Sequence, residues 1–501
     1  MQRRHWLGWG MAGSALVGWV PRSLRAATPG IDAPPEPGAP PPLRVPTVQG
    51  QRLANGLQML VVTRPGLPLV TAALHQRAGR EADPPGLAGL AALTAALLAK
   101  GAWRGDSQRS ATEIAREAET LGSALDVNTG WQQANLAMTV TTPKLAAALD
   151  LMADLVRAPL FEAAELERQR AQMLDALRVS MAAPGEVAAM AARRAYWGAS
   201  AYGASATVAS LARIKREQVQ SFHLERYQPD QAVLVLAGDI SIDAALLMAT
   251  RSFGSWQGKA TALALPAPAH SSDAATVLVD MPGSGQSGVV LVAPFAAVND
   301  AEHRIAEVAA AVLGGGYSAR LNQEIRIKRG LSYGAFGGGE SQRSGGMFSA
   351  QVQTDHPNAA QVAALMRELV LGVARASLPR AELLARQATL VGSFARQLGT
   401  TAGLAALVAS SWLQGRGLDA LARYADEVLA VTPEQVRDYA ARHWTAAALR
   451  TVVSLDLKVA SATASVTASV TALPADALRV RLSALDLESD TLGAVPPATP
   501  R

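Results

Sequence analysis

The chain has 501 residues, of which 49% are hydrophobic and 17% charged, a composition typical of globular proteins that excludes a largely disordered chain. It contains no cysteine, which excludes disulfide bonds, cysteine nucleophiles and cysteine-based zinc sites. The formal charge of +5 is reduced almost to zero when the first 27 residues are left out, because they hold four arginines and no acid. The composition therefore offers no electrostatic basis for a nucleic-acid partner.

Residues 1–27 have the pattern of a secretory signal. Arg3 and Arg4 precede an apolar run over residues 7–20, and small residues follow at Ala26 and Ala27. The run is too short for a comfortable membrane span, which needs about 20 residues. The arginine pair fits twin-arginine export, an ordinary secretory signal that carries two arginines fits equally well, and an uncleaved anchor is the third alternative. We expect an exported protein whose mature chain has no membrane span.

Changes in composition divide the remaining chain into five parts. A proline-rich tether is expected at 28–46, since such a sequence forms neither helix nor central strand. An Ala/Pro/Ser-rich linker at 256–274 separates two long patterned segments, 47–255 and 275–457. Residues 458–501 begin with a low-complexity Ala/Ser/Thr/Val stretch that fits a flexible tail or a strand.

The two long segments repeat each other at a constant offset. The run Glu-Gln-Val at 217–219 recurs at 434–436, and Glu165-Leu166 recurs as Glu382-Leu383, each time 217 residues later. Several matches at one offset indicate a duplicated domain. Local patterns agree with this interpretation, because each half contains an alternating stretch, a helical stretch and a buried apolar strand: 134–141, 145–157 and 232–240, then 347–354, 360–374 and 449–456. We predict an α+β fold of two homologous halves, each a mostly antiparallel sheet packed with helices.

A family resemblance begins in the first half. The run Arg-Leu-Ala-Asn-Gly-Leu at 52–57 is followed by Gly-Leu-Ala-Gly-Leu-Ala-Ala-Leu at 86–93. This pairing resembles the opening of the insulinase-type (pitrilysin-like) zinc peptidases, the inverzincins, in which an L-x-N-G-L strand precedes a helix with H-x-x-E-H. There the two histidines bind Zn²⁺ and the glutamate is the general base. Here the three positions hold Gly89, Ala92 and Leu93, which supply no metal donor and no base.

The resemblance also implies a third zinc ligand, a glutamate on a later helix. The position that matches it is Ala176, and Asp175 lies one residue away, about 100° around a helix. Three ligands and the base are thus absent together, and a metal needs several donors at once. We expect no zinc in this chain and no peptide hydrolysis by the chain alone.

A second resemblance lies in the other half, where residues 313–336 are similar to the family's segment with R-x-x-x-G-L-x-Y. The matching pair is Arg326 and Tyr333, seven residues apart. In active members these two side chains hold the substrate carbonyl and help to stabilise the oxyanion, a role that suits a guanidinium and a phenol. The alternative is that Arg326 is a solvated basic residue and Tyr333 packs on a strand.

Together, the resemblances imply a two-chain enzyme with a clamshell fold. We predict that this chain is the non-catalytic, substrate-binding subunit of a heterodimeric insulinase-type zinc peptidase in the periplasm. The partner would be a homologous chain that carries H-x-x-E-H and the zinc, and the substrate a peptide. The alternative is a non-enzymatic clamshell scaffold or peptide-binding protein. Nothing in the sequence supports a free-standing enzyme with an unrelated site.

Overall fold

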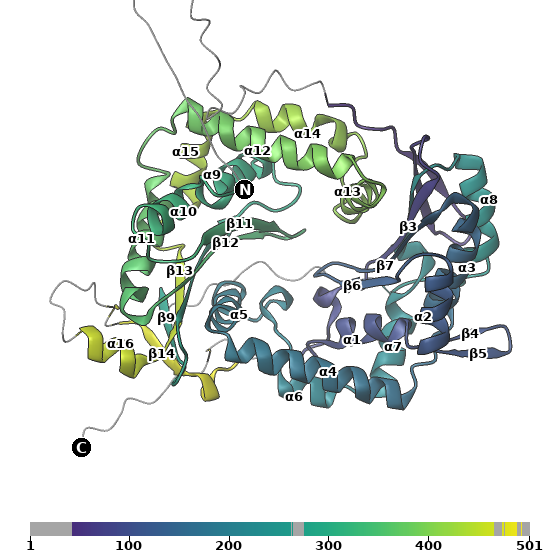
Figure 1. Ribbon diagram of the computed structural model, residues 1–501, viewed down its shortest axis with the longest axis horizontal. Helices are drawn as coiled ribbons and strands as arrows, with labels where there is room; N and C mark the ends of the chain where they lie inside the picture. Colours follow the sequence, from purple (N-terminus) through teal and green to yellow (C-terminus); the bar gives the residue numbers. More distant parts are fainter. Residues whose placement is uncertain are drawn as a thin grey trace, which may run out of the picture. The chain divides into compact units, whose positions relative to one another are not determined.

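The computed structural model describes residues 43–261, 263, 275–464, 473–474, 476–487 and 492 (Figure 1). The predicted export signal, nearly all of the tether, most of the linker and much of the tail lie outside these residues. From Arg44 onward the described chain forms one compact unit. None of its helices has both the length and the apolar composition to cross a membrane.

The first half contains a six-stranded mixed sheet in the order β1-β2-β8-β3-β7-β6. Only the β2/β8 pair is parallel. The edge strand β1 is exposed, whereas β7 alternates, with its even-numbered residues facing the core up to Val140. The bounds of the strands are β1 (Gln49–Arg52), β2 (Gln58–Thr63), β3 (Leu69–Gln76), β6 (Asp126–Thr129), β7 (Ala134–Thr141) and β8 (Ala232–Gly238).

Eight α-helices and a small hairpin, β4 (Gly101–Arg104) with β5 (Ser107–Ser110), complete the described part of this half. The helix α2 begins at a capping box, in which Ser110 and Glu113 satisfy each other's free backbone N–H groups. The helices are α1 (Leu90–Leu98), α2 (Ala111–Thr120), α3 (Leu145–Arg157), α4 (Ala163–Ala182), α5 (Pro184–Trp197), α6 (Val208–Arg213), α7 (Arg216–Arg226) and α8 (Ile242–Phe253).

The second half repeats this plan with the sheet order β11-β12-β10-β13-β9-β14. Three of its five strand pairs are antiparallel, and the β13/β9 and β14/β9 pairs are parallel. The strands are β9 (Thr276–Asp280), β10 (Ser287–Phe295), β11 (Ala335–Ser341), β12 (Gly346–Thr354), β13 (Arg450–Leu455) and β14 (Leu478–Arg481). The helices are α9 (His303–Gly314), α10 (Arg320–Asn322), α11 (Ala359–Gly372), α12 (Arg380–Leu398), α13 (Thr401–Leu413), α14 (Ala420–Leu429), α15 (Pro433–His443) and α16 (Leu457–Ala464).

The duplication predicted from the offset of 217 is confirmed by the elements. The helix α15 begins and ends 217 residues after α7. Corresponding strands occupy the same places in the two sheets, from β6 and β11 at one edge to β1 and β14 at the other. The strands β1 and β14 are the exception. β1 comes at the start of the first half and is antiparallel to β2, whereas β14 comes at the end of the second half and is parallel to β9. Residues 478–481, within the stretch predicted as a tail, thus belong to the second sheet.

Each half covers a face of the other half's sheet with one helix. The helix α5 of the first half packs against β10, β12 and β13, and α13 of the second half packs against β3 and β8 (Figure 1). The buried face of α5 forms a separate core with the second sheet that includes Val187, Ala191, Val290 and Val452. The two helices correspond at the 217-residue offset, so the exchange is reciprocal.

Polar contacts also connect the two halves. Arg77 donates hydrogen bonds to the backbone carbonyls of Leu413 and Trp412, at 2.9 and 3.1 Å, at the end of α13. Glu81 is buried and forms an ion pair with Arg343, which lies in the turn between β11 and β12. These contacts join residues more than 250 positions apart, so the two halves form one folded body.

Candidate functional site

One cavity of about 360 Å³ lies at the start of α1. Gly89 and Ala92 from the α1 region and Ala176 from α4 all line it. Leu93 does not, because its side chain is fully buried in the core of the first half. The structure therefore brings three of the four positions singled out in the sequence to one cavity and directs the fourth into the core.

Gly89 is closed to a larger side chain. Its φ of +103° lies in the left-handed region that favours glycine. A Cβ placed there would lie 2.8 Å from Cδ2 of Leu211 and 3.3 Å from Cβ of Ala206. A histidine at this position would therefore meet both backbone strain and a steric clash.

Asp83 holds the backbone of this position. Its Oδ2 accepts a hydrogen bond of 2.8 Å from the Gly89 N–H, and its Oδ1 accepts one of 2.7 Å from the Ala91 N–H. Burial raises the pKa of Asp83 to about 7, although both amides and Arg80 favour the charged form. Both oxygens are occupied by the free N–H groups at the start of α1, so Asp83 caps a helix. The sequence analysis did not single out this residue, although an aspartate shortly before a helix is the available signal.

The cavity offers no metal site. Across the described ranges, no group of three or more His, Asp or Glu side chains is arranged to hold a metal ion. Asp175 does not line the cavity, and its exposed carboxylate pairs with Arg178 on the same face of α4. The donor set needed for zinc is absent from the residues that surround Ala92 and Ala176.

Arg326 and Tyr333 lie side by side. The guanidinium carbon of Arg326 lies 4.8 Å from the ring centre of Tyr333 and 5.3 Å from that of Tyr317. Arg326 belongs to a π-helical turn, Gln323–Ile327, a local geometry found often at functional sites. In the described part of the chain neither the Arg326 nor the Tyr333 side chain has a hydrogen-bond or ion-pair partner, and Tyr333 is 90% exposed. Their donors are thus available to a ligand.

Residues that the sequence analysis did not name hold this pair in place. The buried Asn322 donates a 2.7 Å hydrogen bond to the carbonyl of Tyr317 and accepts one of 3.3 Å from the N–H of Ala335, at the start of β11. It therefore ties together the two segments that carry the aromatic rings. Beside Tyr333 is a cavity of about 510 Å³, lined by the exposed Phe336 and by glutamines that include Gln351. An exposed aromatic ring beside an arginine and a polar cavity can bind a peptide main chain and its side chains.

Two family profiles match the sequence. One, described as Insulinase (Peptidase family M16), matches residues 59–207, and the other, described as Peptidase M16 inactive domain, matches residues 213–390. The chain belongs to the insulinase family, peptidase family M16. The resemblance seen in the sequence is thereby confirmed.

M16 relatives are similar to this chain over most of their own length. An uncharacterized zinc protease of Streptomyces coelicolor is 24% identical over 402 residues, which cover 78% of this chain and 86% of that protein. The non-peptidase homolog YmxG of Helicobacter pylori is 25% identical over 333 residues, which cover 65% of this chain and 75% of that protein. The relatives thus include both proteins described as zinc proteases and a protein described as a non-peptidase.

Solved M16 structures share the fold. A peptidase M16 inactive domain from Pseudomonas fluorescens superposes with a TM-score of 0.75 at 24% identity, over 81% of this chain and 98% of that chain. The periplasmic protease PqqL from Escherichia coli superposes with a TM-score of 0.68 at 15% identity, over 92% of this chain and 52% of that chain. At these identities the likeness establishes the fold, and the arrangement of helices on two mixed sheets is that of the M16 family.

Proposed function

We propose that this M16 member is the non-catalytic, substrate-binding subunit of a two-chain zinc metallopeptidase. Its partner would be an M16 chain with an intact H-x-x-E-H helix, and the pair would degrade or process peptides in the periplasm. The observation that carries the proposal is a contrast within one chain. At Gly89, the position of the first zinc ligand, the left-handed backbone disfavours a side chain, whereas Arg326 and Tyr333 lie side by side and Tyr333 is exposed.

The contrast favours a subunit over a scaffold. The contacts of Arg326 with aromatic rings do not by themselves require Tyr333 to be exposed or Arg326 to lack a carboxylate partner in the described chain, whereas a role in ligand binding accounts for both. Arginine and tyrosine both donate hydrogen bonds to an oxygen that gains negative charge. In the proposed complex they would meet the carbonyl of the scissile peptide next to the partner's zinc.

The cavity at Gly89 and the cavity at Tyr333 meet at the same short corner of the chain. Ser180 and Glu186, on either side of the α4–α5 junction, line the cavity at Gly89. Gln351 lines the cavity at Tyr333, and a Cβ on Gly185 would lie 2.9 Å from its amide nitrogen. We infer that an extended peptide bound at Tyr333 follows this corner.

Export to the periplasm is part of the proposal. It rests on the signal-like sequence of residues 1–27. A periplasmic fold neighbour from Escherichia coli is compatible with that location. Fusing residues 1–27 to a reporter and following its appearance in the periplasm, with Arg3 and Arg4 both changed to lysine as a second arm, tests export and its route.

Reconstitution tests the function. The purified chain, an H-x-x-E-H homologue from the same organism and their mixture should be assayed with a fluorogenic peptide library and by elemental analysis. We expect no stoichiometric zinc in this chain, and cleavage that depends on both chains. In the mixture, Arg326→Ala or Tyr333→Phe should lower turnover by about 10²–10³, the loss measured for a single oxyanion donor in other hydrolases.

Arg329→Ala is the matched control. Arg329 lies in the same loop and pairs with Glu324, so its loss should leave turnover unchanged. Size-exclusion chromatography must show that all variants still assemble. If the double variant of Arg326 and Tyr333 keeps turnover within about a factor of two of the wild type, the pair is structural and the scaffold becomes the better interpretation.

A further inference from the structure

Two adjoining cavities lie in the second half, away from both sites described above. Their volumes are about 550 and 320 Å³, and they share four lining residues, among them Arg304 and Arg416. The smaller cavity is the duplicate of the one at Gly89. Its residues Leu390, Ser393, Phe394, Gln397 and Leu407 follow Met173, Ala176, Leu177, Ser180 and Met190 by 217 positions each.

The duplicate carries charged side chains that its counterpart lacks. The helix α1 begins at Leu90, which corresponds to Glu307, but α9 begins one turn earlier, at His303. This extra turn contributes His303 and Arg304 to the cavity walls, and Glu307, in the place of Leu90, also lines them. The corresponding residues of the first half are Gly86, Leu87 and Leu90, which carry no charge.

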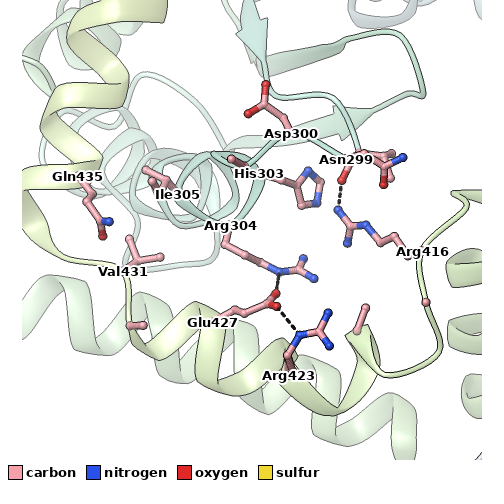
Figure 2. A pocket seen from close by; sticks show the side chains of 15 residues that line it. Asn299, Asp300, His303, Arg304, Ile305, Arg416, Arg423, Glu427, Val431 and Gln435 are labelled. Atoms are coloured by element: carbon pink, nitrogen blue, oxygen red, sulfur yellow. Dashed lines mark hydrogen bonds and ion pairs between the residues drawn. The ribbon is translucent and has the colours of Figure 1, made fainter.

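The arginines at the cavities differ in their partners. Figure 2 shows the side chains of Arg304, Arg416 and Arg423, from three segments, directed toward the same space. Arg304 pairs with Glu307 at 2.8 Å and with Glu427 at 3.0 Å, and Arg423 pairs with Glu427 at 3.2 Å and also with Asp419. Within the described chain the Arg416 side chain has no carboxylate partner and donates one hydrogen bond, to the carbonyl of Val298.

The electrostatic surroundings of Arg416 favour an added anion. Burial and the nearby charge of Arg304 lower the pKa of Arg416, and the acids Glu307 and Glu427 oppose this only in part. Both acids are already bound to Arg304. A ligand carboxylate would supply the missing charge and could accept two parallel hydrogen bonds from the guanidinium.

The backbone fixes Arg416 before any ligand arrives. Gly415 has a φ of +70°, and its N–H donates to the carbonyl of Trp412 at the end of α13. The N–H of Arg416 donates a 2.9 Å hydrogen bond to the carbonyl of Ser411. The helix α13 thus ends with Gly415 in the left-handed conformation that glycine favours, and this turn directs Arg416 toward the cavities.

Apolar and aromatic side chains form part of the lining of the smaller cavity, which Arg416 also lines. Leu390, Leu407 and Leu421 line it together with Phe394 and Tyr424, whose ring centres lie 4.4 Å apart. We propose that the two cavities form a binding site for a carboxylate joined to an apolar body, with the carboxylate on Arg416 and the body against Phe394 and Tyr424. The chemistry is that of a peptide's C-terminal end with an apolar last residue, or of a short fatty acid.

Calorimetric titration of the full chain tests this site. The probes are N-acetylphenylalanine, its C-terminal amide, octanoate and inorganic phosphate. We expect saturable binding of at least one of the two carboxylates, which identifies the peptide-like or the fatty-acid source, and no binding of the amide. Arg416→Gln should weaken that binding by about 10- to 100-fold, as expected for a hydrogen bond to a charged group.

Two further variants make the result decisive. Arg437→Gln removes an exposed arginine of the same half that pairs only with the adjacent Asp438 in the described chain, and it should bind as the wild type does. Ala420→Phe fills the junction of the two cavities without altering any arginine, and it should abolish binding even if Arg416→Gln proves unstable. Equal binding of acid and amide, binding of phosphate alone, or no binding of either carboxylate would each overturn the proposal.

Discussion

A histidine cannot simply be returned to position 89. The backbone there is left-handed, and the side chain of Leu211 fills the space that a Cβ would enter. We predict that Gly89→His lowers the free energy of unfolding by about 2–4 kcal/mol, from backbone strain and overpacking together. Urea unfolding measures this loss.

Ala92→Glu is the control for that variant. Ala92 lies on the wall of the same cavity and has room for a side chain, so its substitution should cost less than about 1 kcal/mol. Equal stability of Gly89→His and the wild type would show that Leu211 gives way and that this position remains open to a ligand.

His223 makes the stability depend on pH. It is buried between Phe161 and Tyr227, and its Nε2 donates a 2.8 Å hydrogen bond to the carbonyl of Val156. Burial lowers the pKa of His223 from 6.5 to about 4. In the unfolded chain the ring takes up its proton near pH 6.5, so its contribution is fully present above that pH and is lost as the pH falls toward 4. The shift corresponds to roughly 3 kcal/mol.

We predict that His223→Gln, which keeps a donor for Val156, flattens the decline in stability between pH 7 and pH 4. The comparison is the free energy of unfolding of the variant against the wild type at several pH values. Subtraction is needed because the buried His75, whose pKa is also lowered by burial, contributes a slope of the same sign. Parallel curves for the two proteins would contradict the prediction.

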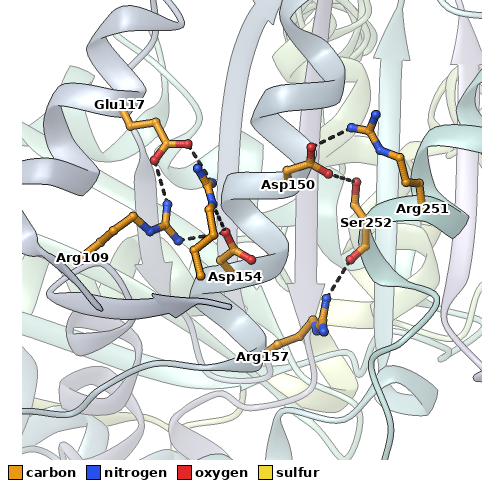
Figure 3. A network of polar contacts seen from close by, with 8 residues as sticks. Arg109, Glu117, Asp150, Asp154, Arg157, Arg251 and Ser252 are labelled. Carbon is orange, nitrogen blue, oxygen red and sulfur yellow. Dashed lines mark hydrogen bonds and ion pairs between the residues drawn. The ribbon is translucent and has the colours of Figure 1, made fainter. Parts of the chain in front are cut away.

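At the scale of elements, a network of charges joins the β4–β5 hairpin to α2 and α3 (Figure 3). Asp154 accepts hydrogen bonds of 2.7 Å from Arg104 and 2.9 Å from Arg109. Arg109 is only 9% exposed and depends on Asp154 and Glu117 for its compensation. We predict that Asp154→Asn lowers the free energy of unfolding by about 2–4 kcal/mol, because it leaves a buried charge partly uncompensated.

The matched control is Asp175→Asn. Asp175 and its partner Arg178 are each 70% exposed, so the loss of this pair should change stability by less than about 0.5 kcal/mol. Chemical denaturation of both variants decides the comparison. Similar losses in the two variants would mean that burial of Arg109 does not determine the strength of the network.

For the whole molecule, the exchange of α5 and α13 makes each half depend on the other. A chain cut between Thr261 and Ala275 would leave each sheet without the helix that covers one face. We predict that fragments 44–261 and 275–501 are insoluble when expressed singly and form a stable complex when expressed together. Solubility and co-elution on size-exclusion chromatography provide the measurement.

A substitution pair in α5 controls for nonspecific association of the fragments. Ala188 is fully buried in the core between α5 and the second sheet, so Ala188→Glu should prevent the complex by burying an unpaired charge. Glu186 is exposed, and Glu186→Gln should leave the complex intact. Independent folding of either fragment would show that the helix exchange is dispensable.

Much of the site was recognisable in the sequence, because its signals are local. The residue types at 89, 92, 93 and 176 are enough to predict that a zinc site is lacking, since no neighbour can supply a missing donor atom. The resemblance to the family's R-x-x-x-G-L-x-Y segment, rather than the spacing alone, pointed to Arg326 and Tyr333, whose side chains lie next to each other in the structure. Asp83, Leu211 and Asn322 were not predicted, because their roles arise from contacts with residues elsewhere along the chain.

The sequence by itself determined the duplication and the main helices and strands, since periodicity and offset are properties of the chain, and its family resemblance predicted the loss of the zinc ligands and the candidate pair. Only the tertiary structure decided which sheet each helix covers, that β14 joins the second sheet, and that Arg416 faces two cavities without a carboxylate partner in the described chain. The apolar residues on one face of a helix indicate that this face is buried, but they do not indicate which element covers it. That choice depends on long-range packing, which no local pattern encodes.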